Sequence, residues 1–255
     1  MDPALRLPPE ILDHVFSFLK SDLSALKASA SAHSLLSKLV ERHLYADITV
    51  CNLEASDGHS FSSTQLLKLL SDNPHIANYV YGLHILLTNR FGESSTMAPI
   101  FGQLPNLRRV ILESHRFPWE LLMKQFRCAF LECLRSPSIK EVSVWGLFGF
   151  PLSGLSNCSG LKYLSVDDDC SHFDVTSNHL FPPLESLSVS NCRTLTGFVA
   201  WAKQGALRSL EFQATSRSYF SDLPELLEAC SGTLTSLVLG LHKTRQYILI
   251  SPLSQ

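Results

Sequence analysis

Residues 184–192 read LESLSVSNC, and this stretch decides how the second half of the chain folds. Its first six residues follow the pattern LxxLxL, in which a short strand alternates buried and exposed side chains. Cys192 then occupies the Asn/Cys position of such a unit, which caps the turn beneath the strand. Pro182 and Pro183 precede the pattern, stop a helix and favour extended backbone. The stretch therefore predicts one strand and one turn of a repeating unit.

The same pattern recurs along the chain. Its six copies are Leu107-Val110-Leu112, Ile139-Val142-Val144, Leu161-Leu164-Val166, Leu184-Leu187-Val189, Leu207-Leu210-Phe212 and Leu234-Leu237-Leu239. Successive copies begin 32, 22, 23, 23 and 27 residues apart, and four of these five spacings match a leucine-rich-repeat period of roughly 20 to 29 residues. Helical patterns at 121–134, 198–202 and 223–230 separate some of the strands, the last with Asp222 as its expected N-cap. The chain resembles leucine-rich-repeat proteins over about residues 79–241, which implies stacked parallel strands.

The residues between the apolar positions should project from one shared, concave face of that sheet. They are Arg109, Ile111, Glu113, Glu141, Ser143, Trp145, Tyr163, Ser165, Asp167, Ser186, Ser188, Ser190, Ser209, Glu211 and Gln213. Aromatic side chains on a small, polar surface are typical binding anchors. We therefore expect Trp145 and Tyr163, with Arg109 and Glu141 beside them, to contact a protein substrate. The alternative is that the glycine-rich loop 146–150 covers Trp145.

The first residues carry a different pattern. Residues 7–19 read LPPEILDHVFSFL, with prolines suited to a helix start and apolar residues at helical spacing. Residues 22–45 read DLSALKASASAHSLLSKLVERHLY, where Asp22 is the expected N-cap of a second helix and a third apolar stretch follows. Three short helices are too small to bury all their apolar surface, so part of it should meet another protein. The alternative is that they are simply the first helices of an α-helical domain.

Residues 7–45 resemble an F-box, whose pattern begins Leu-Pro-x-Glu-Ile/Leu-Leu and continues through an Asp-Leu pair. The family usually has Cys where Ser29 stands and Trp where Leu36 stands. The resemblance implies that the helices bind the Skp-type adaptor of a cullin-RING ubiquitin ligase. The residues expected at that contact are Leu7, Pro8, Ile11, Leu12, Val15, Phe16, Leu23, Leu26 and Leu36.

The chain thus divides into an F-box (1–45), a degenerate lead-in cap and first repeat (46–106) and a leucine-rich-repeat-like solenoid (107–255). Within the lead-in we expect a strand at 46–50, a helix at 66–70 and a strand at 79–87. At the far end, 247–250 either forms an irregular closing strand or marks a chain shorter than its relatives. The predicted fold class is α/β, with parallel strands.

Composition limits the function classes. The formal net charge is −2 without a run of Lys or Arg, which predicts no nucleic-acid or membrane partner. Met1-Asp2-Pro3 begins no signal peptide, and the seven cysteines lack paired spacing, so we expect reduced thiols and a cytoplasmic or nuclear protein. Neither a phosphate loop nor a GxSxG, HExxH or paired-cysteine motif occurs, so we expect no enzyme activity, cofactor or metal.

One acidic run was weighed as a cation site. Asp167, Asp168 and Asp169 are followed by Cys170, His172 and Asp174, but the run lacks the glycine and glutamate of a calcium loop. We interpret it as a solvated loop.

The resemblance implies an adaptor that holds a Skp-type subunit and a protein substrate together for ubiquitin transfer. The alternative is an interaction scaffold that does not join a ligase.

Overall fold

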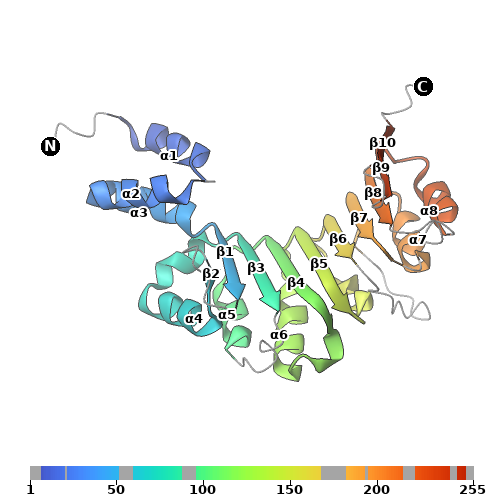
Figure 1. Ribbon diagram of the computed structural model, residues 1–255, viewed down its shortest axis with the longest axis horizontal. Coiled ribbons are helices and arrows are strands. Elements are labelled where there is room, and N and C mark those ends of the chain that lie inside the picture. The colour runs from blue at the N-terminus through green and yellow to red at the C-terminus, as the bar shows by residue number, and fades with distance from the viewer. Residues whose placement is uncertain are drawn as a thin grey trace.

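The computed structural model describes residues 7–20, 22–51, 60–87, 96–167, 182–192, 195–214, 222–241 and 246–250. Over these residues the protein is a mixed α/β structure with one ten-stranded sheet, in the order β10-β9-β8-β7-β6-β5-β4-β3-β1-β2. Nine strands run parallel, and only β10 is antiparallel to its neighbour β9. Figure 1 shows these strands side by side along a bent sheet, with α4 to α8 outside the bend.

The strands are short and separated by helices or turns. They are β1 (Asp47–Cys51), β2 (Ser60–Phe61), β3 (Gly82–Leu87), β4 (Arg109–Pro118), β5 (Glu141–Phe148), β6 (Tyr163–Asp167), β7 (Ser186–Ser190), β8 (Ser209–Ala214), β9 (Ser236–Leu241) and β10 (Gln246–Ile250). The α-helices are α1 (Pro9–Phe18), α2 (Leu23–Ala32), α3 (Ser34–Leu44), α4 (Ser63–Asp72), α5 (Met97–Gln103), α6 (Lys124–Leu134), α7 (Thr196–Ala202) and α8 (Leu223–Cys230). Three 3-10 helices join them, η1 (Pro74–Tyr79), η3 (Trp119–Leu121) and η4 (Leu152–Asn157). No helix of the described ranges is both long and apolar enough to cross a bilayer.

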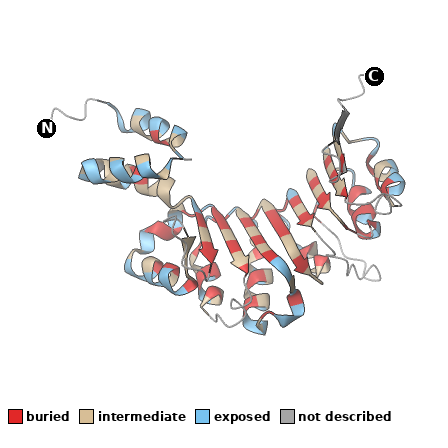
Figure 2. Ribbon diagram, in the orientation of Figure 1, coloured by how far each residue is buried: buried red, intermediate tan, exposed pale blue. Residues whose placement is uncertain are grey.

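The six predicted repeat strands are confirmed as neighbours in chain order, from β4 to β9. Equivalent residues align across all six, beginning with Arg109, Glu141, Tyr163, Ser186, Ser209 and Ser236. The same register brings Val110, Val142, Leu164, Leu187 and Leu210 together, and all five are buried. Figure 2 shows the resulting alternation of buried and half-buried residues along the strands. The apolar positions of LxxLxL therefore form one continuous core.

The lead-in strands and helix are confirmed, with shifted bounds. The strand predicted at 79–87 begins only at Gly82, because Pro74–Tyr79 forms η1. Helix α4 is longer than 66–70 because a capping box starts it: Ser62 Oγ accepts from the Gln65 N–H, and the Gln65 side chain accepts from the Ser62 N–H. Helix α5 was not predicted from the sequence. Its seven residues include Pro99 and Gly102, and both residue types are unfavourable in helices.

Two local predictions around the repeats are wrong, and one alternative left open by the sequence does not agree with the structure. The helix expected at 121–134 is split, because Leu122 and Met123 adopt extended backbone between η3 and α6. Residues 146–150 are not a loop over Trp145, since β5 continues to Phe148. Asp222 makes no side-chain cap to α8; its carboxylate instead accepts a 3.1 Å hydrogen bond from the Leu195 N–H beside α7.

Helices α1 to α3 form a separate small core. Phe16, Leu26 and Val40 are buried there, outside the larger core of the sheet. The predicted cap of α2 is confirmed: the Asp22 carboxylate accepts a 3.0 Å bond from the Ala25 N–H, which with the Ser24 hydroxyl lowers the pKa of Asp22. Asp13 of α1 pairs with Arg42 and His43 of α3 at 2.7 and 2.6 Å. These contacts hold α1 against α3.

Candidate functional site

The side of the sheet away from α4 to α8 is a polar surface, which we call the open face. It consists of the strand positions that alternate with the core residues, and the predicted concave positions all belong to it. Most of these side chains are half-buried, and Ser143 is buried. Because parallel strands repeat the same register, these side chains form continuous rows across the sheet. Ile111, Ser143, Ser165, Ser188 and Glu211 form one such row.

Arg109 is held at one end of the open face. Its guanidinium donates to the Asp47 carboxylate at 2.6 Å, across the intervening strand β3. The residue between them is Gly82, where a Cβ atom would lie 1.9 Å from Asp47 Oδ1. The missing side chain of Gly82 therefore makes room for the ion pair. Glu141 is its register neighbour on β5 and lines a smaller hollow of about 270 Å³ with Tyr163.

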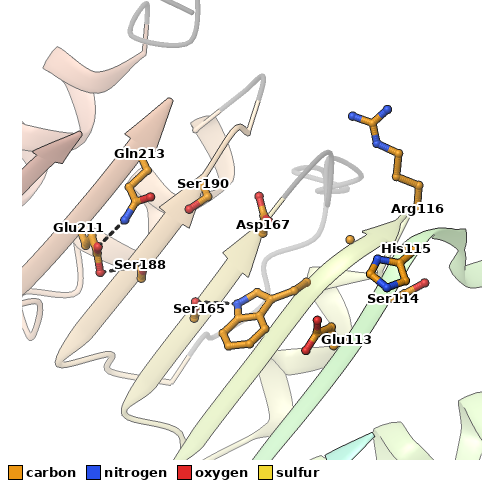
Figure 3. A pocket seen from close by; sticks show the side chains of 12 residues that line it. Glu113, Ser114, His115, Arg116, Ser165, Asp167, Ser188, Ser190, Glu211 and Gln213 are labelled. Atoms are coloured by element: carbon orange, nitrogen blue, oxygen red, sulfur yellow. Dashed lines mark hydrogen bonds between the residues drawn. The ribbon is translucent and has the colours of Figure 1, made fainter. Parts of the chain in front are cut away.

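A hollow of the open face lies toward the carboxyl ends of β4 to β8, with a volume of about 740 Å³ (Figure 3). Its lining residues are Glu113, Ser114, His115, Arg116, Trp145, Gly146, Ser165, Asp167, Ser188, Ser190, Glu211 and Gln213. Three of them are carboxylates, and the rest are mostly small polar side chains. The hollow is therefore suited to hydrogen bonding with a polar partner rather than to enclosing an apolar ligand.

Hydrogen bonds fix several of these side chains. Glu211 accepts from Ser188 Oγ at 3.2 Å and from Gln213 Nε2 at 2.7 Å, and Glu113 lies 2.9 Å from His84 Nε2. Ser114 is buried, and its hydroxyl has no hydrogen-bond partner among the described residues. The surface is thus largely preorganised, which lowers the entropy cost of binding.

Trp145 and Tyr163 both lie on the open face, as predicted, but in different ways. The Trp145 indole N–H donates to Ser165 Oγ on the neighbouring strand β6 at 3.1 Å, which ties the ring to that strand. It is half-buried, whereas Tyr163 is 44% exposed. The Trp145 side chain is therefore held in place by a neighbouring strand, and much of the Tyr163 side chain remains accessible.

A second candidate surface is the outer side of α1. Leu7, Ile11, Val15 and Phe18 are 53%, 49%, 45% and 73% exposed, which is unusual for four large apolar side chains in one short segment. Pro8 is also exposed, where it precedes the helix. Phe18 is an apolar member of this surface that the sequence reasoning did not include, although its exposure agrees with the helical spacing from Ile11 and Val15.

The other residues expected at an adaptor contact lie in or against the core of the three helices. Phe16 and Leu26 are 5% and 0% exposed, so in the free chain they support the exposed surface from beneath, and their contact with an adaptor stays a prediction. Leu12, Leu23 and Leu36 are partly buried against the same core. The reason is geometric: Leu12 and Phe16 are four residues apart and share the helix face that meets α3, whereas Ile11 and Val15 share a neighbouring face about 100° around the helix.

Other reactive groups offer little chemistry. Burial raises the pKa of the Cys133 thiol to about 12 and that of Cys158 to about 11, so neither is a ready nucleophile at neutral pH. Of the acidic run weighed as a cation site, only Asp167 lies within the described residues. Among those residues, no three His, Cys, Asp or Glu side chains are placed to hold a metal ion.

The chain was compared with known protein families, curated proteins and solved structures. No family model matches it, and neither a curated protein nor a solved structure is significantly similar.

Proposed function

We propose that this protein is a substrate-recognition adaptor of a cullin-RING ubiquitin ligase. Residues 7–45 would act as an F-box that docks on a Skp-type subunit. The repeats would form a leucine-rich-repeat-like solenoid whose open face binds the protein substrate. The chemistry of ubiquitin transfer would belong to the partners, and this chain would raise the effective concentration of the substrate.

The observation that carries the proposal is the apolar outer side of α1. Leu7, Ile11, Val15 and Phe18 remain exposed although α1 to α3 have a core of their own. Exposed apolar residues gathered on one small module are typical of a protein-binding surface. Their positions fall in the segment whose sequence resembles an F-box.

The direct test is binding of the purified full-length chain to a purified Skp-type subunit, measured by calorimetry. A 1:1 complex at micromolar concentration or tighter is expected. If the folded chain does not bind, the adaptor proposal is lost, and an interaction scaffold outside any ligase becomes the better explanation.

The substrate side of the proposal gives a prediction for the open face. Tyr163→Ala and Trp145→Ala should each weaken capture of native partners, because aromatic anchors commonly contribute about 2 kcal/mol, or about 30-fold in affinity. Trp145→Ala should also lower stability slightly, since it removes the hydrogen bond to Ser165. Quantitative mass spectrometry of partners recovered with each variant measures the loss.

Leu121→Ala is the matched control, because Leu121 is 67% exposed but lies in η3, outside the open face. It should leave partner recovery unchanged. Equal recovery with wild type and Tyr163→Ala would remove the open face from the proposal, as would equal losses with Tyr163→Ala and Leu121→Ala.

A further inference from the structure

A second charged feature runs along the edge where the repeat strands begin. The residue after the first apolar residue of each repeat is Arg108, Lys140, Lys162, Glu185, Arg208 and Thr235 in turn. From Lys140 onward, the backbone N–H of each residue donates to the carbonyl of the one before it in this series, at 2.8 to 2.9 Å. These six residues therefore lie side by side on neighbouring chains of the sheet, and we call them the edge row.

The edge row concentrates positive charge. Four of its six residues are cations, in a chain whose formal net charge is −2. Arg108, Lys140 and Lys162 immediately precede β4, β5 and β6, and hydrogen bonds join their backbones in turn. Like charges held this close together repel, which costs some stability. An anionic partner would recover that stability.

Internal contacts neutralise only part of this charge. Lys162 Nζ lies 2.5 Å from Glu185 Oε1, the single carboxylate of the row. Lys140 Nζ donates to the Pro137 carbonyl at 2.9 Å, and the Arg108 guanidinium lies over the Tyr81 ring at 5.2 Å. Neither contact supplies a negative charge. Arg108, Lys162 and Arg208 are all exposed to solvent.

The edge row also borders a hollow of about 640 Å³, separate from the one beside Trp145. Lys140, Lys162, Glu185 and Arg208 line it together with Thr233 and Thr235. Cations here are therefore grouped around a concave surface rather than scattered over a convex one. Such a surface favours binding of carboxylates through charge-assisted hydrogen bonds.

We propose that the edge row binds an acidic segment of a partner protein, laid across the beginnings of the strands. From β4 to β8 the row crosses four strand spacings of about 4.8 Å, a length that about six extended residues span. Glu185 lies within the row, so a peptide that omits a carboxylate opposite it fits better than a nucleic acid with a phosphate at every nucleotide. The site does not depend on the adaptor proposal, because neither α1 nor the Trp145 hollow contributes to it.

The test uses the full-length chain and a fluorescein-labelled octapeptide of alternating Glu and Ser, followed by fluorescence anisotropy at low salt. Lys140→Glu combined with Arg208→Glu should weaken binding by more than about tenfold, because two attractive charges become repulsive. Lys124→Glu combined with Lys203→Glu is the matched control, because it changes the net charge equally at two exposed lysines outside the edge row, one at the start of α6 and one just after α7. It should leave binding within about twofold. Raising the salt should weaken the wild-type interaction.

Glu185→Gln is expected to change the affinity for the peptide in the opposite direction. It removes the one repulsive charge in the row, so it should tighten peptide binding about threefold, an effect that a purely structural role would not produce. No binding of the acidic peptide by wild type, equal binding of the matching Lys-Ser peptide, or equal losses in the two double variants would each overturn the proposal. Tighter binding of a labelled octathymidine would also overturn it, in favour of a nucleic-acid site.

Discussion

Replacing Ile11 and Val15 together with Asp is expected to abolish binding to a Skp-type subunit while the sheet remains folded. The two side chains are 49% and 45% exposed on the outer side of α1, so the free protein tolerates a charge there. A surface substitution of this kind typically changes stability by within about 0.5 kcal/mol. An apolar interface that buries the same carboxylates without partners loses several kcal/mol, which corresponds to about a thousandfold or more in affinity.

Calorimetric titration of the Skp-type subunit measures the affinity, and circular dichroism with thermal melting measures the fold. Lys20→Asp combined with Lys38→Asp is the control, because both lysines are exposed polar residues of the same module, one in the turn after α1 and one in α3. The control should bind like wild type. If it fails equally, general charge repulsion explains the loss; if the Ile11 and Val15 variant still binds, α1 is not the contact.

The distinction between Ile11 and Phe16 marks the limit of what sequence pattern alone could tell about this module. Helical spacing identified an apolar helix, but α1 carries apolar residues on two sides. Which side faces α3 depends on tertiary packing, here reinforced by the Asp13 contacts with Arg42 and His43. The sequence could therefore predict that α1 has an exposed apolar surface. It could not show that only one of the two apolar sides of the helix belongs to that surface.

The strands were predictable because the LxxLxL pattern shows both the spacing of the repeats and the side of the strand on which each side chain lies. That is why the register rows from Arg109 to Ser236 agree with the sequence prediction. The edge row was missed for a related reason. Its cations lie 22 to 46 residues apart, so they form no basic run in the sequence, and only stacking of the strands brings them together. Aligning the six repeats on their first apolar residue would have revealed the row.

Deviations from ideal repeats were harder to predict, because they depend on contacts between neighbouring strands. Pairing of β4 with β5 is irregular between Glu113 and Phe117, where Arg116 adopts a φ of 58°. This irregularity lies beside the Trp145 hollow, which Ser114, His115 and Arg116 help to line. No repeat pattern specifies such a feature, since it interrupts the pattern. It nevertheless shapes the hollow beside Trp145.

Gly146 allows that irregularity, and Gly146→Ala is expected to destabilise the protein by about 3 kcal/mol. Part of the loss is the cost of a left-handed backbone, about 1 to 2 kcal/mol for an alanine at a φ of 61°. The rest is steric, because the new Cβ would lie 2.0 Å from the Ser114 carbonyl oxygen of β4. A backbone atom cannot rotate away as a side chain does, so β4 and β5 must separate locally.

Gly149→Ala separates these two contributions. Gly149 has a similar φ of 68°, but nothing lies within 4 Å of the Cβ that alanine would add. It should therefore lose only the backbone term of about 1 to 2 kcal/mol. Urea unfolding followed by circular dichroism measures both variants. Equal destabilisation of the two would mean that the contact between Gly146 and Ser114 relaxes at no cost. The expected result is a larger loss of stability in Gly146→Ala than in Gly149→Ala, together with weaker partner capture. That result would show that the close approach of β4 to β5 keeps the hollow beside Trp145 in the shape that binds a partner.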